Sequence, residues 1–257
     1  MASVPICRLH APMKSLFVWM SEKWYVSLFF YFSLKLGVGM INNELKGGGE
    51  MVQVKLLFVM FSFTFLAIGC AATQVKIPVD MASSQPGTQV SFKGNPVKLL
   101  GSPISIGKPL PSVDLVDAMT MNNVDLSKER GSVLLLSIVP SLDTPVCEAQ
   151  THDLGEKGNA LPLSVKRIVI SRDTPFAQKR FANEAKLTNL QYLSDYKQGD
   201  FARSTGLLTE GLMLFARSVI VVDKKGIVRY IQVVPEMTHL PDMDKAFQKA
   251  NELVKEG

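Results

Sequence analysis

The sequence predicts an α/β protein, a three-layer α/β/α sandwich that extends from Thr88 to the C-terminus. Two observations lead to this prediction. From residue 88 onward, short continuous apolar runs typical of buried strands alternate with helical segments. The chain then ends with a strand, a glycine turn, a second strand and a helix, the order of an antiparallel hairpin that completes such a sheet. Most apolar runs before residue 70 have neither alternation nor helical spacing, so we expect no globular core there.

The expected elements follow from the apolar pattern and from the turn residues between its runs. Two short strands around Lys93-Gly94-Asn95-Pro96 form an N-terminal β-hairpin. Apolar runs at 133–139, 166–171 and 217–223 indicate strands buried on both faces. The remaining elements are hairpin strands 89–92 and 97–100, strands 113–117, 190–195 and 227–234, helices 145–157, 176–186 and 243–256, and a helical turn at 201–204. This order suits a thioredoxin-like arrangement.

The charge and the cysteine content exclude several classes of function. Residues 1–70 hold six of the 28 Lys and Arg and three of the 23 Asp and Glu, which leaves residues 71–257 with a net charge of only +2. With no basic run in that region, the sequence predicts no nucleic-acid partner. The three cysteines and three histidines are too few and too widely spaced for a disulfide framework or a metal site. We therefore expect neither a metal nor another cofactor.

Residues 51–69 have the pattern of a secretory signal peptide. Lys55 is followed by eleven apolar or small residues, 56–66, and then by Ala67-Ile68-Gly69-Cys70. The ending resembles a bacterial lipobox, in which the cysteine is lipidated and becomes the mature N-terminus. The prediction is a protein of the bacterial cell envelope, anchored to a membrane by a lipid on Cys70. Cleavage without lipidation, which would release a soluble periplasmic protein, is the alternative.

The segments on either side of this signal are predicted to lie outside the fold. Residues 1–50 fit no part of a signal, and the codons for Lys46-Gly47-Gly48 can spell a purine-rich ribosome-binding sequence before Met51. We interpret Met51 as the true start and the codons for residues 1–50 as an untranslated leader. A real N-terminal extension with a second hydrophobic anchor is the alternative. Residues 70–87 are small, polar and turn-prone, which predicts a flexible tether between the lipidated Cys70 and the domain at 88–257.

One cysteine stands where a helix is expected to begin. A buried strand ends at Val139, Thr144 suits the N-cap position, and Pro145 suits the first helical position. Cys147 then lies in the first turn, where unpaired N–H groups and the helix dipole favour a thiolate over a thiol. Since the thiolate is the nucleophile, this placement indicates a reactive sulfur. A buried cysteine that acts only as a small apolar residue is the alternative.

The residues around this cysteine resemble a known family. Pro140-x-x-x-Thr144-x-x-Cys147 is similar to the active-site motif of the peroxiredoxins. Residues 92–97, 171–181 and 215–223 resemble the thiol peroxidase branch in particular, so the resemblance runs from about residue 88 to the C-terminus.

This resemblance implies a role for each motif residue. Cys147 would be the peroxidatic cysteine that reduces hydrogen peroxide and organic hydroperoxides. Thr144 would hold the peroxide, and Pro140 would shield the sulfur from water. Arg217 would stabilise the thiolate and polarise the O–O bond. Read without the resemblance, Thr144 could be only an N-cap, and Arg217 only an exposed charge at the start of a strand. The family also implies a homodimer.

One position departs from the family. Thiol peroxidases usually carry a resolving cysteine directly after Arg180-Phe181, and here that residue is Ala182. The sulfenic acid formed on Cys147 must then be reduced by an external thiol, from a thioredoxin-like protein or a small molecule. Disulfide exchange is a weaker hypothesis, because its usual Cys-x-x-Cys has Thr144 at the first position. A redox-sensing or binding lipoprotein module is the remaining alternative.

Overall fold

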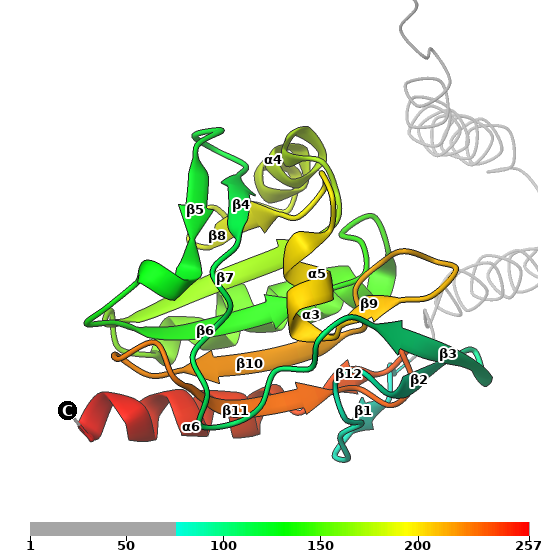
Figure 1. Cartoon of the computed structure of the whole chain (residues 1–257). Helices are drawn as coiled ribbons and strands as arrows, with labels where there is room; N and C mark the ends of the chain where they lie inside the picture. The colour runs from blue at the N-terminus through cyan, green and yellow to red at the C-terminus, as the bar shows by residue number, and fades with distance from the viewer. Residues whose placement is uncertain (1–75, 257) are drawn as a thin grey trace, which may run out of the picture. The chain divides into compact units, whose positions relative to one another are not determined.

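The computed structural model describes residues 76–256, which are coloured in Figure 1. The predicted leader, the signal peptide and the lipidated Cys70 lie outside these residues. Within residues 76–256, no helix is both long and apolar enough to cross a membrane.

The core of the fold is a seven-stranded mixed β-sheet. Its strand order is β11-β10-β6-β7-β8-β4-β5, with β6, β7 and β8 parallel and the outer strands antiparallel to their neighbours. The bounds are β4 Asp114–Asp117, β5 Asn123–Asp125, β6 Val133–Ile138, β7 Val165–Ser171, β8 Gln191–Ser194, β10 Ser218–Val222 and β11 Val228–Val233. Every residue of β6 and β10 is buried, as the continuous apolar runs predicted.

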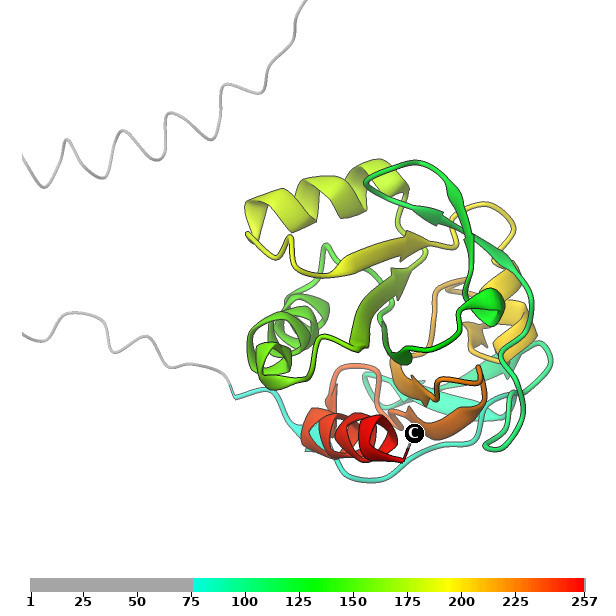
Figure 2. The same cartoon turned by 90° about the vertical axis from the view of Figure 1, so that its left-hand side faces the viewer.

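Two outer layers cover the sheet, so the predicted sandwich is confirmed (Figure 2). One layer consists of helices α3 (Pro145–Glu156), α4 (Pro175–Glu184) and α6 (Met243–Lys255). The opposite layer contains α5 (Asp200–Thr205) and a small sheet of β2 (Gln89–Phe92), β3 (Asn95–Leu100) and β9 (Leu208–Thr209). Short 3₁₀ turns lie at η1 (Leu126–Lys128) and η2 (Lys157–Ala160).

Strand β6 shows how the two layers share the sheet. Leu134 and Leu136 pack in the hydrophobic cluster of the β2–β3 and α5 layer. Val133 and Leu135 pack in the cluster that contains Cys147 and the buried faces of α4 and α6. Successive side chains of a strand point to opposite faces, so one apolar run supports both cores.

The segment just before Thr88 differs from the predicted tether. Strand β1 (Val79–Asp80) pairs in parallel with β12 (Leu240–Pro241), and Ser84 forms an isolated bridge with Val233. The side-chain amide of Gln232 also donates to the carbonyl oxygen of Asp80 at 2.6 Å. The polar composition indicated a linker, but the backbone groups of this segment find partners on the far end of the chain. The ordered domain therefore begins before Thr88.

Candidate active site

Cys147 is the third residue of α3, which begins after the loop that follows β6. Pro145 occupies the first helical position and Thr144 the N-cap, as predicted. The cysteine is a free thiol and is fully buried, with 0% of its surface exposed. It packs in the cluster between the sheet and the α3, α4 and α6 layer. The end of an apolar strand and the proline at the helix start thus direct this sulfur into the protein.

Arg217 reaches the same point from the residue before β10. Its Nη2 lies 3.3 Å from the Sγ of Cys147, and only 2% of the residue is exposed. The alternative of an exposed charge at the start of a strand is therefore wrong. Sequence places the two residues 70 positions apart. The antiparallel pairing of β10 with β6 brings them together, since Ser218 lies opposite Ile138.

The other hydrogen bonds of Arg217 go to neutral acceptors. Its Nε donates to the carbonyl oxygen of Met237 at 2.9 Å, and its Nη1 donates to Gln150 Oε1 at 2.8 Å. Gln150 in turn donates from Nε2 to Ser137 Oγ at 2.8 Å. No carboxylate lies within salt-bridge distance of this guanidinium among residues 76–256. The acceptors of the guanidinium are therefore two neutral groups and the sulfur of Cys147.

Sequence reasoning missed Gln150 and Ser137, although both left a signal. Gln150 follows Cys147 by three residues and so lies on the same face of α3. Ser137 is the one polar residue inside the apolar run of β6, and it is fully buried. A buried polar side chain requires a hydrogen-bond partner, so a polar residue within an apolar strand indicates a buried hydrogen bond.

Thr144 and Pro140 lie at the two ends of the loop before α3. Pro140 is buried, and Thr144 is exposed. The Thr144 hydroxyl donates to the carbonyl oxygen of Ser141 at 3.0 Å and does not cap the helix. The alternative that Thr144 serves only as a capping side chain is therefore not supported, although the residue does occupy the N-cap position.

Asp173 holds this loop from the end of β7. Its carboxylate accepts hydrogen bonds from Ser141 Oγ at 2.8 Å, from the Leu142 N–H at 2.8 Å and from Ser171 Oγ at 2.7 Å. The residue lies in the stretch that resembled the thiol peroxidases, but sequence alone assigned it no role. Three bonds to one carboxylate fix the backbone that leads into the helix of Cys147.

A hollow of about 370 Å³ lies between the start of α3 and the C-terminal end of α4. Its lining residues are Leu142, Asp143, Thr144, Pro145, Glu148, Phe181, Glu184 and Ala185. Arg180 of α4 donates from Nη2 to Asp143 Oδ1 at 3.1 Å and so joins α4 to the loop before α3 at the surface. Ala182 is fully buried in the same cluster as Cys147. In residues 76–256 no second thiol accompanies Cys147.

Comparison with known proteins agrees with this arrangement. Residues 105–247 match the family model described as Redoxin. The chain is 40% identical over 160 residues to the thiol peroxidase of Staphylococcus saprophyticus, covering 62% of this chain and 96% of that protein. It is 38% identical over 161 residues to the thiol peroxidase of Halalkalibacterium halodurans, covering 63% and 96%.

A solved structure is similar over the same region. The crystal structure of a peroxiredoxin-like protein from Aquifex aeolicus superimposes with a TM-score of 0.61 at 34% identity, covering 67% of this chain and 99% of that one. The family match spans more than half of the chain, and the relatives are matched over almost their whole length. This chain therefore belongs to the redoxin family, as a peroxiredoxin-type enzyme related to the thiol peroxidases.

Proposed function

We propose that this protein reduces hydrogen peroxide and organic hydroperoxides through Cys147 and is recycled by an external thiol. The observation that carries the proposal is the contact of 3.3 Å between Arg217 Nη2 and Cys147 Sγ in a buried site. The guanidinium has no competing carboxylate among residues 76–256, so its charge remains available to the sulfur and to a bound peroxide. An anionic sulfur beside a fixed positive charge is the nucleophile that peroxide reduction requires.

In the first step, a lone pair of the Cys147 thiolate attacks the hydroxyl oxygen of the peroxide. An S–O bond forms as the O–O bond breaks, which oxidises the sulfur to a sulfenic acid. The departing oxygen leaves with the bonding pair and takes up a proton to become water or an alcohol. Arg217 stabilises the charge that develops on the departing oxygen. Thr144 holds the peroxide, and Pro140 limits the access of water.

Access of the reductant to the sulfur requires movement. Because Cys147 is fully buried, a thiol reductant cannot reach it unless the first turn of α3 opens. The hollow beside this turn, lined by Thr144 at the N-cap and by Pro145 and Glu148 of α3, provides space for the opening. Fraying of a terminal helical turn costs little compared with unfolding of the domain.

An external thiol completes the cycle because α4 has Ala182 where relatives carry a resolving cysteine. The first thiol attacks the sulfenic sulfur of Cys147, which forms a mixed disulfide and releases water. A second thiol attacks this disulfide, so Cys147 returns to the thiol and the reductant leaves as a disulfide. A thioredoxin-like protein or a small thiol can supply both reducing equivalents.

The proposed location of the enzyme rests on its first seventy residues. We propose a lipid on Cys70 and a place in the bacterial cell envelope, with the domain facing the periplasm or the exterior. The signal pattern of residues 51–69 supports this proposal, and the secreted soluble form remains the alternative. A homodimer, implied by the family resemblance, is also proposed and is tested by light scattering.

Peroxide consumption by the full chain in detergent tests the proposed activity. With dithiothreitol or a thioredoxin system, we expect many turnovers per protein molecule, and none for Cys147→Ser. Cys70→Ser should leave turnover unchanged, because a lipidated Cys70 has no free thiol to take part in the cycle. A single oxidation of Cys147 without turnover, with every reductant tried, would instead identify a redox-sensing module.

A further inference from the structure

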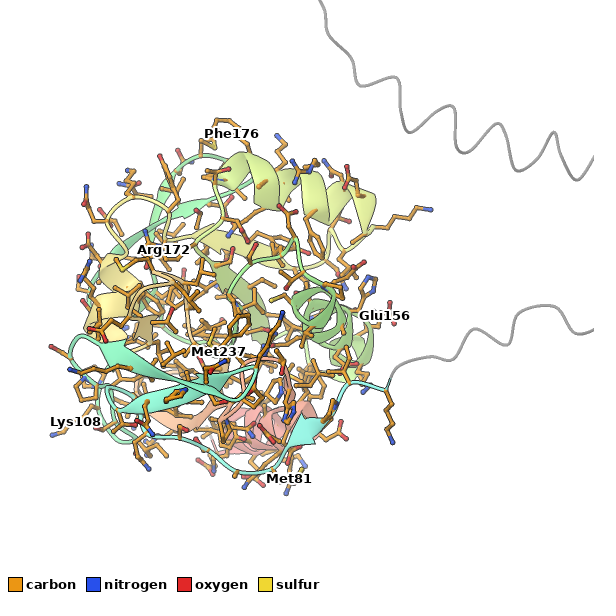
Figure 3. All side chains as sticks on the ribbon, turned by 90° about the vertical axis from the view of Figure 1, so that its right-hand side faces the viewer. Met81, Lys108, Glu156, Arg172, Phe176 and Met237 are labelled. Atoms are coloured by element: carbon orange, nitrogen blue, oxygen red, sulfur yellow. The ribbon has the colours of Figure 1, made fainter. Side chains whose placement is uncertain are left out.

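The turn after β11 holds Arg217 in place. The Met237 carbonyl accepts from Arg217 Nε at 2.9 Å, and the Val234 N–H donates to the Arg217 carbonyl oxygen at 2.9 Å. Figure 3 shows Met237 near the centre of the view and Phe176 at its edge. Met237 is 3% exposed and Phe176 is 72% exposed. The orientation of the guanidinium therefore depends on where the 234–239 turn lies.

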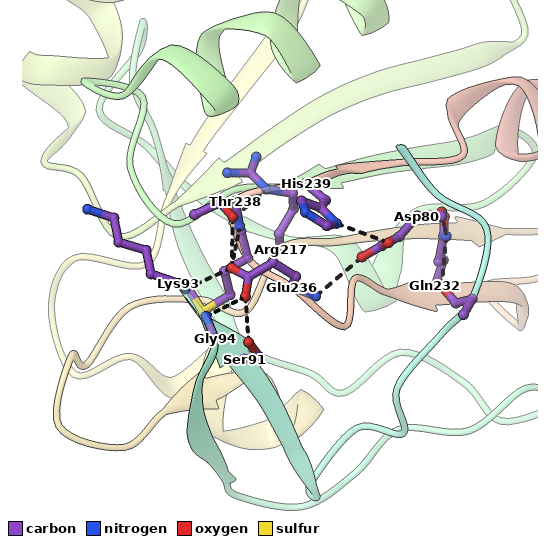
Figure 4. Close-up of polar contacts among 11 residues, drawn as sticks. Asp80, Ser91, Lys93, Gly94, Arg217, Gln232, Glu236, Thr238 and His239 are labelled. Atoms are coloured by element: carbon purple, nitrogen blue, oxygen red, sulfur yellow. Dashed lines mark hydrogen bonds and ion pairs between the residues drawn. The ribbon is translucent and has the colours of Figure 1, made fainter. Parts of the chain in front are cut away.

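Glu236, next to Met237, fastens this turn to the N-terminal hairpin (Figure 4). Its carboxylate accepts from the Lys93 N–H at 2.9 Å and the Gly94 N–H at 3.0 Å. It also accepts from Ser91 Oγ, and from the Thr238 N–H and hydroxyl at 3.1 and 2.8 Å. Five donors from two distant parts of the chain thus converge on one side chain.

The hairpin turn offers its N–H groups because of its conformation. Lys93 and Gly94 both have positive φ, 52° and 79°, as a two-residue type I′ loop requires. Positive φ is unfavourable for Lys93, which has a side chain, and the carboxylate of Glu236 satisfies the N–H groups that this conformation exposes. The two segments also exchange backbone bonds, from Ser91 N–H to the Pro235 carbonyl at 2.7 Å and from Met237 N–H to the Ser91 carbonyl at 2.8 Å.

Strand β1 secures the same turn from its other side. Asp80 accepts from the Glu236 N–H at 3.3 Å and lies 3.1 Å from His239 Nδ1. The residues around Met237 are thereby held between β1 and the β2–β3 hairpin (Figure 4).

Glu236 is an anion throughout the physiological range. Partial burial raises its pKa, but the hydrogen bonds from Ser91, Gly94, Thr238 and Lys93 outweigh burial and lower the pKa of Glu236 to about 2. Hydrogen bonds to an ionised acceptor are stronger than those between neutral groups. The turn is therefore fixed by bonds that a neutral glutamine would only partly replace.

We propose that Glu236 is a positioning residue of the peroxidase site, which acts on Cys147 through Met237 and Arg217. The inference rests on the proposed function, since it assumes that Arg217 promotes the reaction of Cys147. Loss of the carboxylate would let the turn shift, and the Met237 carbonyl would no longer direct Arg217 Nε. A guanidinium less well aimed at the sulfur stabilises both the thiolate and the departing oxygen less effectively.

A double-mutant cycle separates positioning from a purely structural role. The four proteins are wild type, Glu236→Gln, Arg217→Ala and the double variant, each as the full chain in detergent. Oxidation of Cys147 by hydrogen peroxide is followed by rapid quench and mass spectrometry, because residues 76–256 contain no tryptophan. We expect Glu236→Gln to slow oxidation roughly ten-fold, as small displacements of a catalytic group do. In the Arg217→Ala background the same substitution should change the rate less than about two-fold, because coupled residues are not additive.

Equal slowing by Glu236→Gln in both backgrounds would overturn the proposal, as would an unchanged rate in the single variant. Glu252→Gln is the matched control. That carboxylate also accepts side-chain bonds, from Gln248 and Lys249 at 3.1 Å, but it lies on the surface of α6. It should leave the rate unchanged.

Two further measurements distinguish failure of this proposal from misfolding of the variant and from failure of the proposed peroxidase function. If Glu236→Gln does not fold, Ser91→Ala removes one donor to the same carboxylate and should slow oxidation by a smaller factor. Alkylation of Cys147 by iodoacetamide is measured in the same cycle and needs no peroxide. If wild type reacts with iodoacetamide but not with peroxide, the proposed function fails. The same non-additive pattern in alkylation would still support positioning by Glu236, and additive effects would refute it.

Discussion

The Arg217 guanidinium lies 3.3 Å from the Cys147 sulfur and has no carboxylate partner among residues 76–256. Its two other acceptors are neutral, the Met237 carbonyl and the Gln150 side-chain oxygen. These two bonds hold the guanidinium against the sulfur. The fold thus places a fixed positive charge beside Cys147.

Arg217→Ala should slow the first oxidation of Cys147 by about 10²-fold or more, the scale for removal of a group that stabilises developing charge. Arg217→Lys should recover only part of this loss. An ammonium group lacks the planar set of donors with which the guanidinium contacts the Met237 carbonyl, Gln150 and the sulfur at the same time. Rapid-quench mass spectrometry measures the rate. Arg229→Ala, on the exposed side of β11, serves as the control. Full activity of Arg217→Ala would contradict the mechanism.

Ala182→Cys should protect the enzyme from overoxidation. With peroxide in excess and reductant limiting, the wild-type sulfenic acid should go on to the sulfinic acid, because no internal thiol captures it. A cysteine at position 182 lies on the neighbouring helix at high effective concentration and should form a disulfide with Cys147 once α3 opens. Mass spectrometry across a peroxide series distinguishes the two products. Asn183→Cys, one residue further and exposed, should not protect; equal resistance of wild type and Ala182→Cys would show that recycling does not depend on this position.

The contribution of Glu236 to stability should depend on pH. Its pKa is lowered from 4.5 to about 2 in the folded state, so the folded protein binds fewer protons than the unfolded chain between these values. The stabilisation is complete above the unfolded pKa and is lost as pH falls through the folded pKa. At pH 6, Glu236→Gln should be less stable than wild type by about 1.5–3 kcal/mol, the range for hydrogen bonds to a charged group.

This difference should shrink as the pH falls from about 4.5 towards 2, because the wild-type carboxyl then becomes protonated. Chemical unfolding of both proteins at a series of pH values measures it. Asp125, whose pKa is also lowered to about 2, remains in both proteins, so its effect cancels in the comparison. A constant difference across this range would show that the charge of Glu236 is not what stabilises the turn.

Cys70 should carry a diacylglycerol group and be the mature N-terminus. The physical reason is the pattern of residues 51–70, in which an apolar stretch too short to span a bilayer ends at small residues and a cysteine. Intact-mass analysis of membrane-extracted protein measures this, and Cys70→Ser should remove the lipid mass. A soluble protein that begins after Ala71 or Ala72 would establish secretion without an anchor. The same spectrum reveals any species that contains residues before Met51.

Local patterns of sequence determined the main elements of this protein and the position of its nucleophile. Apolar runs at β6, β7 and β10 could be recognised because strands buried on both faces need continuous apolar residues. Proline at position 145, directly after a threonine suited to the N-cap, located the start of α3 and hence Cys147 in its first turn. These signals lie within a few residues of the structure they predict.

Only the tertiary structure decided what surrounds that nucleophile. Arg217 could be an exposed charge or a buried one, and its burial depends on the antiparallel pairing of β10 with β6. The short strands β1 and β12, which sequence analysis missed, stabilise each other across 160 residues and have too few residues to show a pattern. The sequence assigned no role to Glu236 or Asp173, because their partners lie in other segments of the chain. Propensity and periodicity act over neighbouring residues, whereas a buried polar network depends on contacts that form only when distant segments pack together.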